Sequence, residues 1–234
     1  MRQSNRLWLV AVMAVAFATL AGCQRAAEVR YRVTVEVDDR GTKRSGSAVW
    51  SIAVAKAILP LASPYNARFR GEAVRVVIPG RGYLYALVAA DSGYPENIFG
   101  DRRRAPLGDR LIKPRFKDRM DDIRHIKTMV GATGDLQCVN PAWIGLSCPK
   151  MVRFRDQNDP KTIEIVDPSD LTNSFGSGTR LTRVYVEITD DPVTEGIEPT
   201  LPSFGPETGF DNWYRSLPFG DPRQISKCDF KSCR

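Results

Sequence analysis

The sequence contains a single histidine, His125, among 234 residues. Serine nucleophiles usually depend on a histidine base, and catalytic zinc is commonly held by several histidines. His125 lies among charged residues of a predicted helix, and no serine stands in a G-x-S-x-G turn. Glycine-rich loops with the spacing of a P-loop or a dinucleotide-binding turn are also missing. The sequence therefore offers no familiar catalytic centre, and we expect no metal and no organic cofactor.

The longest apolar run is too short to cross a bilayer. It covers residues 7–20, whereas a membrane-spanning helix needs about 20 residues. Arg2 and Arg6 precede the run and small residues follow it. A positive start, a short apolar middle and a small-residue end are typical of a secretory signal. We therefore expect residues 1–22 to be a signal peptide.

The run ends in Leu20-Ala21-Gly22-Cys23, which resembles the lipobox of bacterial lipoproteins at all four positions. The resemblance implies cleavage before Cys23, diacylglycerol on its thiol and acylation of the new amine. Several acyl chains anchor a protein stably, whereas one chain binds reversibly. In lipoproteins of the enterobacterial type an aspartate after the cysteine causes inner-membrane retention, and here Gln24 follows. We therefore expect a lipid anchor in the outer membrane facing the periplasm, with the periplasmic face of the inner membrane as the alternative.

The charge of the chain is mildly basic, with both signs interspersed. Arg2 and Arg6 belong to the predicted signal, which leaves 32 of the 34 basic side chains against 27 acidic ones. The densest cluster is the arginine triplet at 102–104, which we interpret as part of a solvated loop. Nucleic acid is not an expected partner in the envelope. The candidate partners are an envelope protein and anionic lipid or lipopolysaccharide head groups.

Four cysteines remain besides Cys23, namely Cys138, Cys148, Cys228 and Cys233. An even number in an exported protein indicates two disulfides. The spacings C-x9-C and C-x4-C differ from the paired C-x2-C of structural zinc sites, which argues against zinc. Three pairings are open, and we favour the two local ones.

The residues from 30 to 190 predict a β-rich globular domain. Tyr31, Val33, Val35 and Val37 alternate with polar residues, as in a half-buried strand. A glycine-containing turn then leads into a returning strand at 48–54, and similar strand–turn–strand units follow at 72–90 and 151–166. The last strand covers 180–189. We expect an α+β fold with a mostly antiparallel sheet of about seven strands.

Two helices are expected within this domain. Phe116, Met120, Ile123 and Lys127 fall on one line of an amphipathic helix. A shorter helix is predicted in DPSDLTNSFG, capped by Asp167, with Pro168 at its first position and its end at Gly176.

The remaining segments are expected to be irregular. They are the short linker 23–29 between the lipid anchor and the domain, loops at 59–69 and 92–110, and a Pro- and Gly-rich tail at 191–234 that packs on the domain.

Three blocks of the sequence resemble a family of uncharacterised proteobacterial proteins, many of them lipoproteins. The blocks are TVEVDDRGTKRSGSAV, VRFRDQNDPKTIEIVDPSDL and ITDDPVTEGIE. The resemblance supports an envelope lipoprotein but implies no activity, and it assigns no site residue.

These observations favour a lipid-anchored periplasmic protein with a non-enzymatic binding or accessory role. The alternative is a carboxylate-based enzyme acting on cell-wall glycan, suggested by Asp190, Asp191 and Glu195 after the last strand. Such an enzyme needs two carboxylates about 5–9 Å apart across a cleft. The sequence DQNDP at 156–160 is interpreted as a hairpin turn rather than a calcium loop. An exposed strand edge would favour the binding role, and a pocket with buried acidic groups would favour the enzyme.

Overall fold

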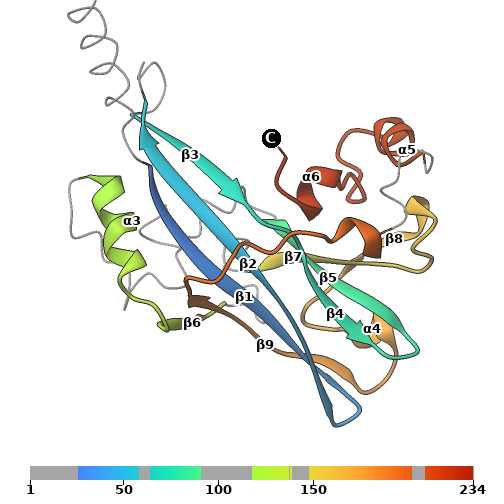
Figure 1. Cartoon of the computed structure of the whole chain (residues 1–234). Helices are drawn as coiled ribbons and strands as arrows, with labels where there is room; N and C mark the ends of the chain where they lie inside the picture. The colour runs from blue at the N-terminus through green and yellow to red at the C-terminus, as the bar shows by residue number, and fades with distance from the viewer. Residues whose placement is uncertain are drawn as a thin grey trace, which may run out of the picture.

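The computed structural model describes residues 26–57, 64–90, 118–136, 138, 148–201 and 209–233. Its strands are β1 (Ala27–Asp39), β2 (Thr42–Lys56), β3 (Tyr65–Arg70), β4 (Val74–Ile78), β5 (Gly82–Ala90), β6 (Thr133–Asp135), β7 (Pro149–Phe154), β8 (Ile163–Val166) and β9 (Thr179–Ile188). Its helices are α3 (Arg119–Lys127), η1 (Pro160–Thr162), α4 (Thr172–Phe175), η2 (Glu198–Thr200), α5 (Phe210–Ser216) and α6 (Lys227–Phe230). The described residues therefore confirm a β-rich antiparallel protein with a few helices (Figure 1).

The larger sheet has five antiparallel strands in the order β3-β2-β1-β9-β6. Its centre is the long β1–β2 hairpin that the alternating pattern predicted. Gly41 adopts a φ of 81° at the turn, and its N–H donates to the Asp38 carboxylate at 2.8 Å. One face of the sheet is buried, and the residues that form it on β1 and β2 are Tyr31, Val33, Val35, Val37, Ala48, Trp50, Ile52 and Val54.

The smaller sheet has four antiparallel strands in the order β4-β5-β7-β8, and it packs on the buried face of the larger one. Its inner side chains, including Val74, Val76 and Leu84, join the same core cluster as β1 and β2. The backbones approach closely at Gly46, where a Cβ atom would overlap the carbonyl oxygen of Arg75. β5 lies between two partners, as its apolar character on both faces predicted.

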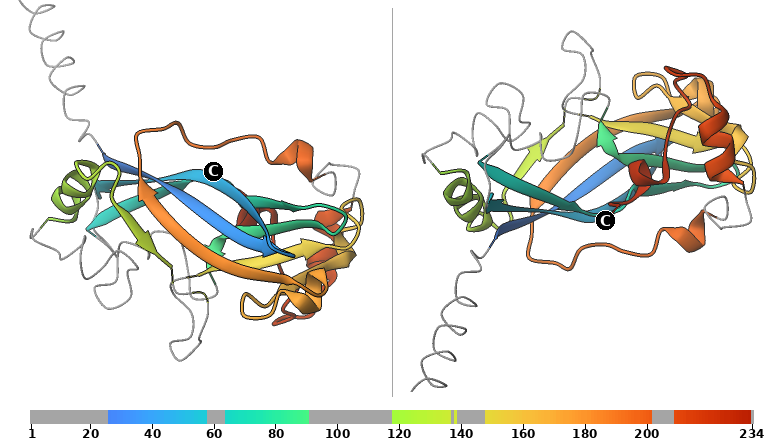
Figure 2. Two further views of the ribbon diagram at one scale, coloured as in Figure 1. Left: turned by 90° about the horizontal axis from the view of Figure 1, so that it is seen from below. Right: turned by 90° about the horizontal axis from the view of Figure 1, so that it is seen from above.

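The C-terminal tail forms a third layer on the far face of the smaller sheet (Figure 2). A second core cluster joins side chains of β5, β7 and β8 to the tail. The tail contributes Ile197, Leu201, Phe210, Ile225 and Phe230 to it. All five are buried, so this Pro- and Gly-rich segment packs on the domain and completes the fold. The prediction that it is irregular was wrong in part, because it contains η2, α5 and α6.

Helix α3 packs against β1 and β2 on the buried face of the larger sheet. The Asp118 side chain caps it by accepting the N–H of Met120 at 2.8 Å. Met120, Ile123 and Ile126 are buried in the first core cluster, which confirms the predicted amphipathic helix. Lys127 is exposed, so the buried stripe follows Ile126 instead.

Four expectations about the strands and the short helix need correction. The strands form two sheets rather than one, and there are more of them among the described residues than the seven expected. The predicted loop 59–69 contains most of β3, because Tyr65 and Phe69 turn inward onto the core between polar neighbours. β1 begins at Ala27 rather than Arg30, since Ala27 and Val29 are already buried.

The fourth correction concerns the short helix, which begins at Thr172 rather than Pro168. The Asp167 carboxylate closes a turn on the N–H of Ser169 at 2.8 Å. Asp170, which lies two residues before the helix begins, accepts the N–H of Thr172 at 3.1 Å. The predicted end at Gly176 is confirmed.

Several predictions fall outside the described residues. These are the signal peptide, Cys23 and the whole of the loop 92–110 with its arginine triplet. Within the described ranges, no helix is long and apolar enough to cross a membrane.

Candidate functional site

A segment that we name the strap, residues 190–198, runs from the end of β9 across the outer face of the larger sheet (Figure 2). Arg30 of β1 donates to the carbonyl oxygens of Asp190 and Asp191 at 3.2 and 3.4 Å. Further along, the N–H of Thr194 donates to the carbonyl oxygen of Val49 on β2 at 3.0 Å. The strap thereby reaches the point at which β3 ends.

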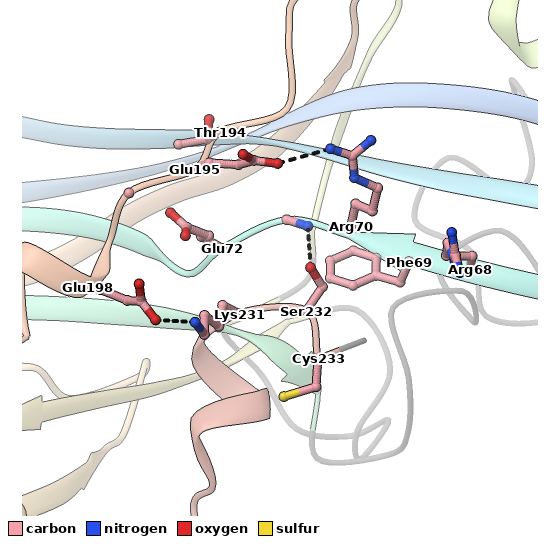
Figure 3. Close-up of a pocket in the computed structure, with 12 residues that line it drawn as sticks. Arg68, Phe69, Arg70, Glu72, Thr194, Glu195, Glu198, Lys231, Ser232 and Cys233 are labelled. Atoms are coloured by element: carbon pink, nitrogen blue, oxygen red, sulfur yellow. Dashed lines mark hydrogen bonds and ion pairs between the residues drawn. The ribbon is translucent and has the colours of Figure 1, made fainter. Parts of the chain in front are cut away.

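A pocket of about 690 Å³ opens between the strap, the end of β3 and the C-terminal residues (Figure 3). Its lining is polar and carries both signs of charge. The charged residues that line it are Arg68, Arg70, Glu72, Glu195, Glu198 and Lys231.

Most of these charges are neutralised inside the pocket. Arg70 pairs with Glu195 at 2.9 Å, and Lys231 pairs with Glu198. Glu72 is only 8% exposed, and its Oε2 accepts the N–H of Ile197 at 2.7 Å. The two exposed carboxylates are therefore committed to cations, and Glu72 serves as an acceptor that fixes the strap.

The outer edge of β3 borders this pocket. The N–H of Ala57 donates to the carbonyl oxygen of Pro64 at 2.9 Å. At every second position after this pair, Asn66, Arg68 and Arg70 stand opposite residues of β2. Because hydrogen-bonded pairs alternate along an antiparallel ladder, the backbone groups of these residues point to β2. The backbone groups of Ala67 and Phe69 consequently point away from the sheet, and the part of the chain that the structure describes provides no hydrogen-bond partner for them.

The C-terminal residues already pair with the continuation of this edge. The N–H of Ser232 donates to the carbonyl oxygen of Gly71 at 2.9 Å, and Glu72 forms an antiparallel bridge with Lys231. The disulfide between Cys228 and Cys233, with Cα atoms 5.2 Å apart, closes this segment. We name residues 231–233 the C-terminal segment. It lies beside Gly71 and Glu72, directly after the end of β3.

Arg68 differs from the other pocket cations. Its side chain lies on the outer face of the larger sheet, on the same side of β3 as that of Arg70, because side chains two residues apart share a face. Arg68 is exposed and, among the described residues, has no acidic partner. A single cation therefore stands beside the backbone groups of Ala67 and Phe69.

The cysteines that the sequence singled out are joined as the two local pairs. Cys138 and Cys148 form the other disulfide, with Cα atoms 4.9 Å apart. This confirms disulfide bonding and the favoured pairing. The two disulfides lie at different places in the fold, one after β6 and one in the C-terminal layer, and within the described ranges no cluster of metal-binding side chains is found.

Two of the three acidic residues behind the enzyme alternative, Asp191 and Glu195, are engaged in structural contacts, and the third, Asp190, accepts from Arg30 through its backbone carbonyl. Asp191 pairs with Arg32, and Glu195 pairs with Arg70. Asp156 and Asp159 accept the N–H groups of Asn158 and Lys161 at 2.9 and 3.0 Å, which confirms the hairpin turn.

The shifted carboxyl groups stabilise local structure. The ion pair with Lys56 and the N–H of Met120 lower the pKa of Asp118. Hydrogen bonds from Ser169 lower the pKa of Asp167, and Arg223 lowers that of Asp221 to about 2. These acids are held ionised, whereas a general acid needs a raised pKa.

Exposed apolar side chains do not single out another surface. Those of large size among the described residues are Val77, Val130, Ile165 and Phe219. Val77 and Ile165 lie on the opposite edges β4 and β8 of the smaller sheet, and the other two lie in separate turns. The edge of β3 and its pocket therefore form the candidate site.

Sequence reasoning missed Arg68, Gly71 and Ser232, because they are not members of a motif. The available signal was the alternation of Tyr65 and Phe69 with Asn66, Arg68 and Arg70. That pattern indicates a strand, but it does not reveal that the strand lies at an edge.

Comparison with known proteins adds no relative, since no family model, curated protein or solved structure matches this chain.

Proposed function

We propose that the protein is a lipid-anchored protein of the bacterial envelope that binds a protein partner and has no catalytic role. The exposed edge of β3 carries this proposal. Edge strands present unpaired backbone groups that readily accept another chain, and Ala67 and Phe69 present such groups at the outer edge of the larger sheet.

The anchor follows from the lipobox-like sequence that ends at Cys23. The two disulfides support export, because disulfides persist in oxidising compartments such as the periplasm. The absence of aspartate after Cys23 favours the outer membrane.

The glycan-acting enzyme has less support. Two of the three carboxylates that suggested it, Asp191 and Glu195, are paired with arginines, and Glu198 in the pocket is paired with Lys231. A glycosidase needs two carboxylates that face the substrate across a cleft, whereas these side chains make ion pairs within the fold.

The anchor is tested by changing Cys23 to Ser in the exporting cell. We expect the wild-type protein to sediment with outer membranes and to show the mass of an acylated chain beginning at Cys23. The Cys23→Ser protein should be soluble in the periplasm or retain its signal peptide. A wild-type mature chain that is not acylated would contradict the anchor.

The binding role is tested by placing a photocrosslinking amino acid at Ala67. The control position is Ile165, which is exposed on the edge strand β8 of the other sheet. We expect a protein adduct in living cells from position 67 and not from position 165. Equal adducts from both positions, or none from position 67, would contradict a partner at β3.

A further inference from the structure

We infer that the β3 edge binds an extended acidic segment of the partner, which adds to the larger sheet as a sixth strand. The inference rests on the proposed binding role and specifies the chemistry of the bound segment.

The geometry for strand addition is present on the chain itself. The C-terminal segment lies along this edge at Glu72 and Gly71, through the bridge of Lys231 to Glu72 and the hydrogen bond from Ser232 to Gly71. A guest strand that pairs with Phe69 and Ala67 would continue this segment along the same edge. Main-chain hydrogen bonds would hold it, and its alternate side chains would give it specificity.

The charge on the outer face of β3 selects an acidic guest. Arg68 and Arg70 project from that face, and β3 itself carries no acidic residue. Glu195 of the strap pairs with Arg70 and leaves Arg68 without an acidic partner among the described residues. A guest side chain opposite Arg68 would make the cross-strand contact that favours opposite charges.

A basic guest is disfavoured by the same arrangement. Like charges directly opposite each other on neighbouring strands are destabilising, and a lysine beside Arg68 would meet this repulsion. The side chains of the guest on the other face would lie near Ala67 and Phe69. Phe69 packs on Trp50 with ring centroids 5.6 Å apart, so small apolar residues suit that face.

Two end-blocked octapeptides of defined sequence serve as probes, one alternating glutamate with valine and one alternating lysine with valine. The protein is the oxidised chain extracted from membranes in nonionic detergent. Fluorescence anisotropy of labelled peptides measures affinity, and hydrogen exchange reports the protection of the Ala67 and Phe69 amides. We expect the glutamate peptide to bind at least ten-fold more tightly than the lysine peptide and to protect both amides.

The variants separate charge from backbone pairing. Arg68→Glu should weaken binding of the glutamate peptide roughly five-fold, in line with the loss of a cross-strand ion pair. Lys161→Glu makes the same change of charge at an exposed residue of the η1 turn and should leave affinity unchanged. Ala67→Pro removes the outward N–H and should abolish binding, whereas Ala67→Val should retain it. Protection of the wild-type amides provides the same information if Ala67→Pro fails to fold.

The outcomes test two claims separately, namely that a guest strand adds to β3 and that this guest is acidic. Equal affinity for both peptides, with binding abolished by Ala67→Pro, would overturn the acidic guest and leave the edge as the binding surface. Binding that survives Ala67→Pro without amide protection, or no binding of either peptide, would overturn strand addition at β3 itself.

Discussion

Tyr85 connects the smaller sheet to the C-terminal layer through one hydroxyl group. Its OH accepts from Gln157 Nε2 at 3.1 Å and donates to the carbonyl oxygen of Thr200 at 3.4 Å. Its ring contacts Phe230 edge-on with centroids 5.8 Å apart. Burial is the main cause that raises the pKa of this phenol, so the folded state holds it neutral.

This shift predicts a loss of stability in alkali. An unfolded tyrosine ionises near pH 10, whereas folded Tyr85 keeps its proton to higher pH. The stabilising effect is complete below about pH 10 and is lost as the pH rises further, because only the unfolded state then gains from ionisation. In Tyr85→Phe the free energy of unfolding should therefore fall less steeply above pH 10 than in the wild type.

The same substitution has a cost at neutral pH. Loss of the hydroxyl leaves Thr200 without its donor, and one hydrogen bond contributes about 0.5–1.5 kcal/mol. Urea titrations from pH 7 to 11 measure both effects. Identical slopes for wild type and Tyr85→Phe would contradict the assignment.

Gly46 fixes the distance between the two sheets. An alanine there would place its Cβ against the carbonyl oxygen of Arg75, which belongs to the β4 backbone and has little freedom to move. We predict that Gly46→Ala lowers the free energy of unfolding by about 1–3 kcal/mol, the usual effect of overpacking. Ser45→Ala changes the exposed neighbour and should stay within about 0.5 kcal/mol of the wild type. Chemical denaturation that finds both variants equally stable would show that the sheets can separate freely at this point.

At the scale of elements, the C-terminal segment depends on its disulfide. Replacing Cys228 and Cys233 together by serine removes a short closed loop, which contributes about 2 kcal/mol on the chain-entropy model. We expect the Ser232 amide to lose hydrogen-exchange protection in this variant, because Ser232 would no longer be tethered beside Gly71. The double serine variant of Cys138 and Cys148 should also be less stable but should keep that amide protected.

A simpler measurement accompanies this one. Thiol labelling of the denatured, unreduced wild-type protein should find none of the four cysteines free. Reactive thiols at these positions would contradict the disulfide pairing, and an unchanged Ser232 amide in the first variant would show that the disulfide does not hold the segment.

Elements whose formation depends on residues adjacent in sequence could be predicted, and those that depend on distant residues could not. The hairpins of β1 with β2 and of β7 with β8 follow from alternation and turn residues adjacent in sequence, and both were predicted. β3 was missed because Pro64 and Asn66 are typical of a loop, whereas pairing with β2 makes the segment a strand.

The candidate site could not be predicted from the sequence, because it also depends on contacts between residues far apart in the chain. That β3 lies at an edge follows from the order of strands in the sheet, and strands paired across long separations leave no local signal. The strap joins residues about 160 positions apart, such as Arg30 and Asp191. By contrast the cysteine pairs are close in sequence, and the favoured local pairing was correct.

At the scale of the whole molecule, the start of β1 and the candidate site lie in one row across the sheet. Ala27 stands opposite Val54, and Val54 stands opposite Ala67. Strands are spaced about 4.8 Å apart, so Ala67 lies roughly 10 Å from Ala27. The four residues from Cys23 to Ala27 reach at most about 14 Å when extended. On the proposed anchor, the β3 edge therefore lies within about 25 Å of the lipid surface.

If the proposed anchor holds the protein and its partner is tethered to the same membrane, the two would meet in two dimensions rather than three. Two chains that are both tethered to one membrane share a thin layer, and tethering raises the effective concentration of one for the other, commonly to the millimolar range for short linkers. A contact built from a few backbone hydrogen bonds and one arginine would then be populated between neighbours in the same membrane and rare with proteins diffusing through the periplasm. Selectivity for the partner would come from shared location as much as from affinity.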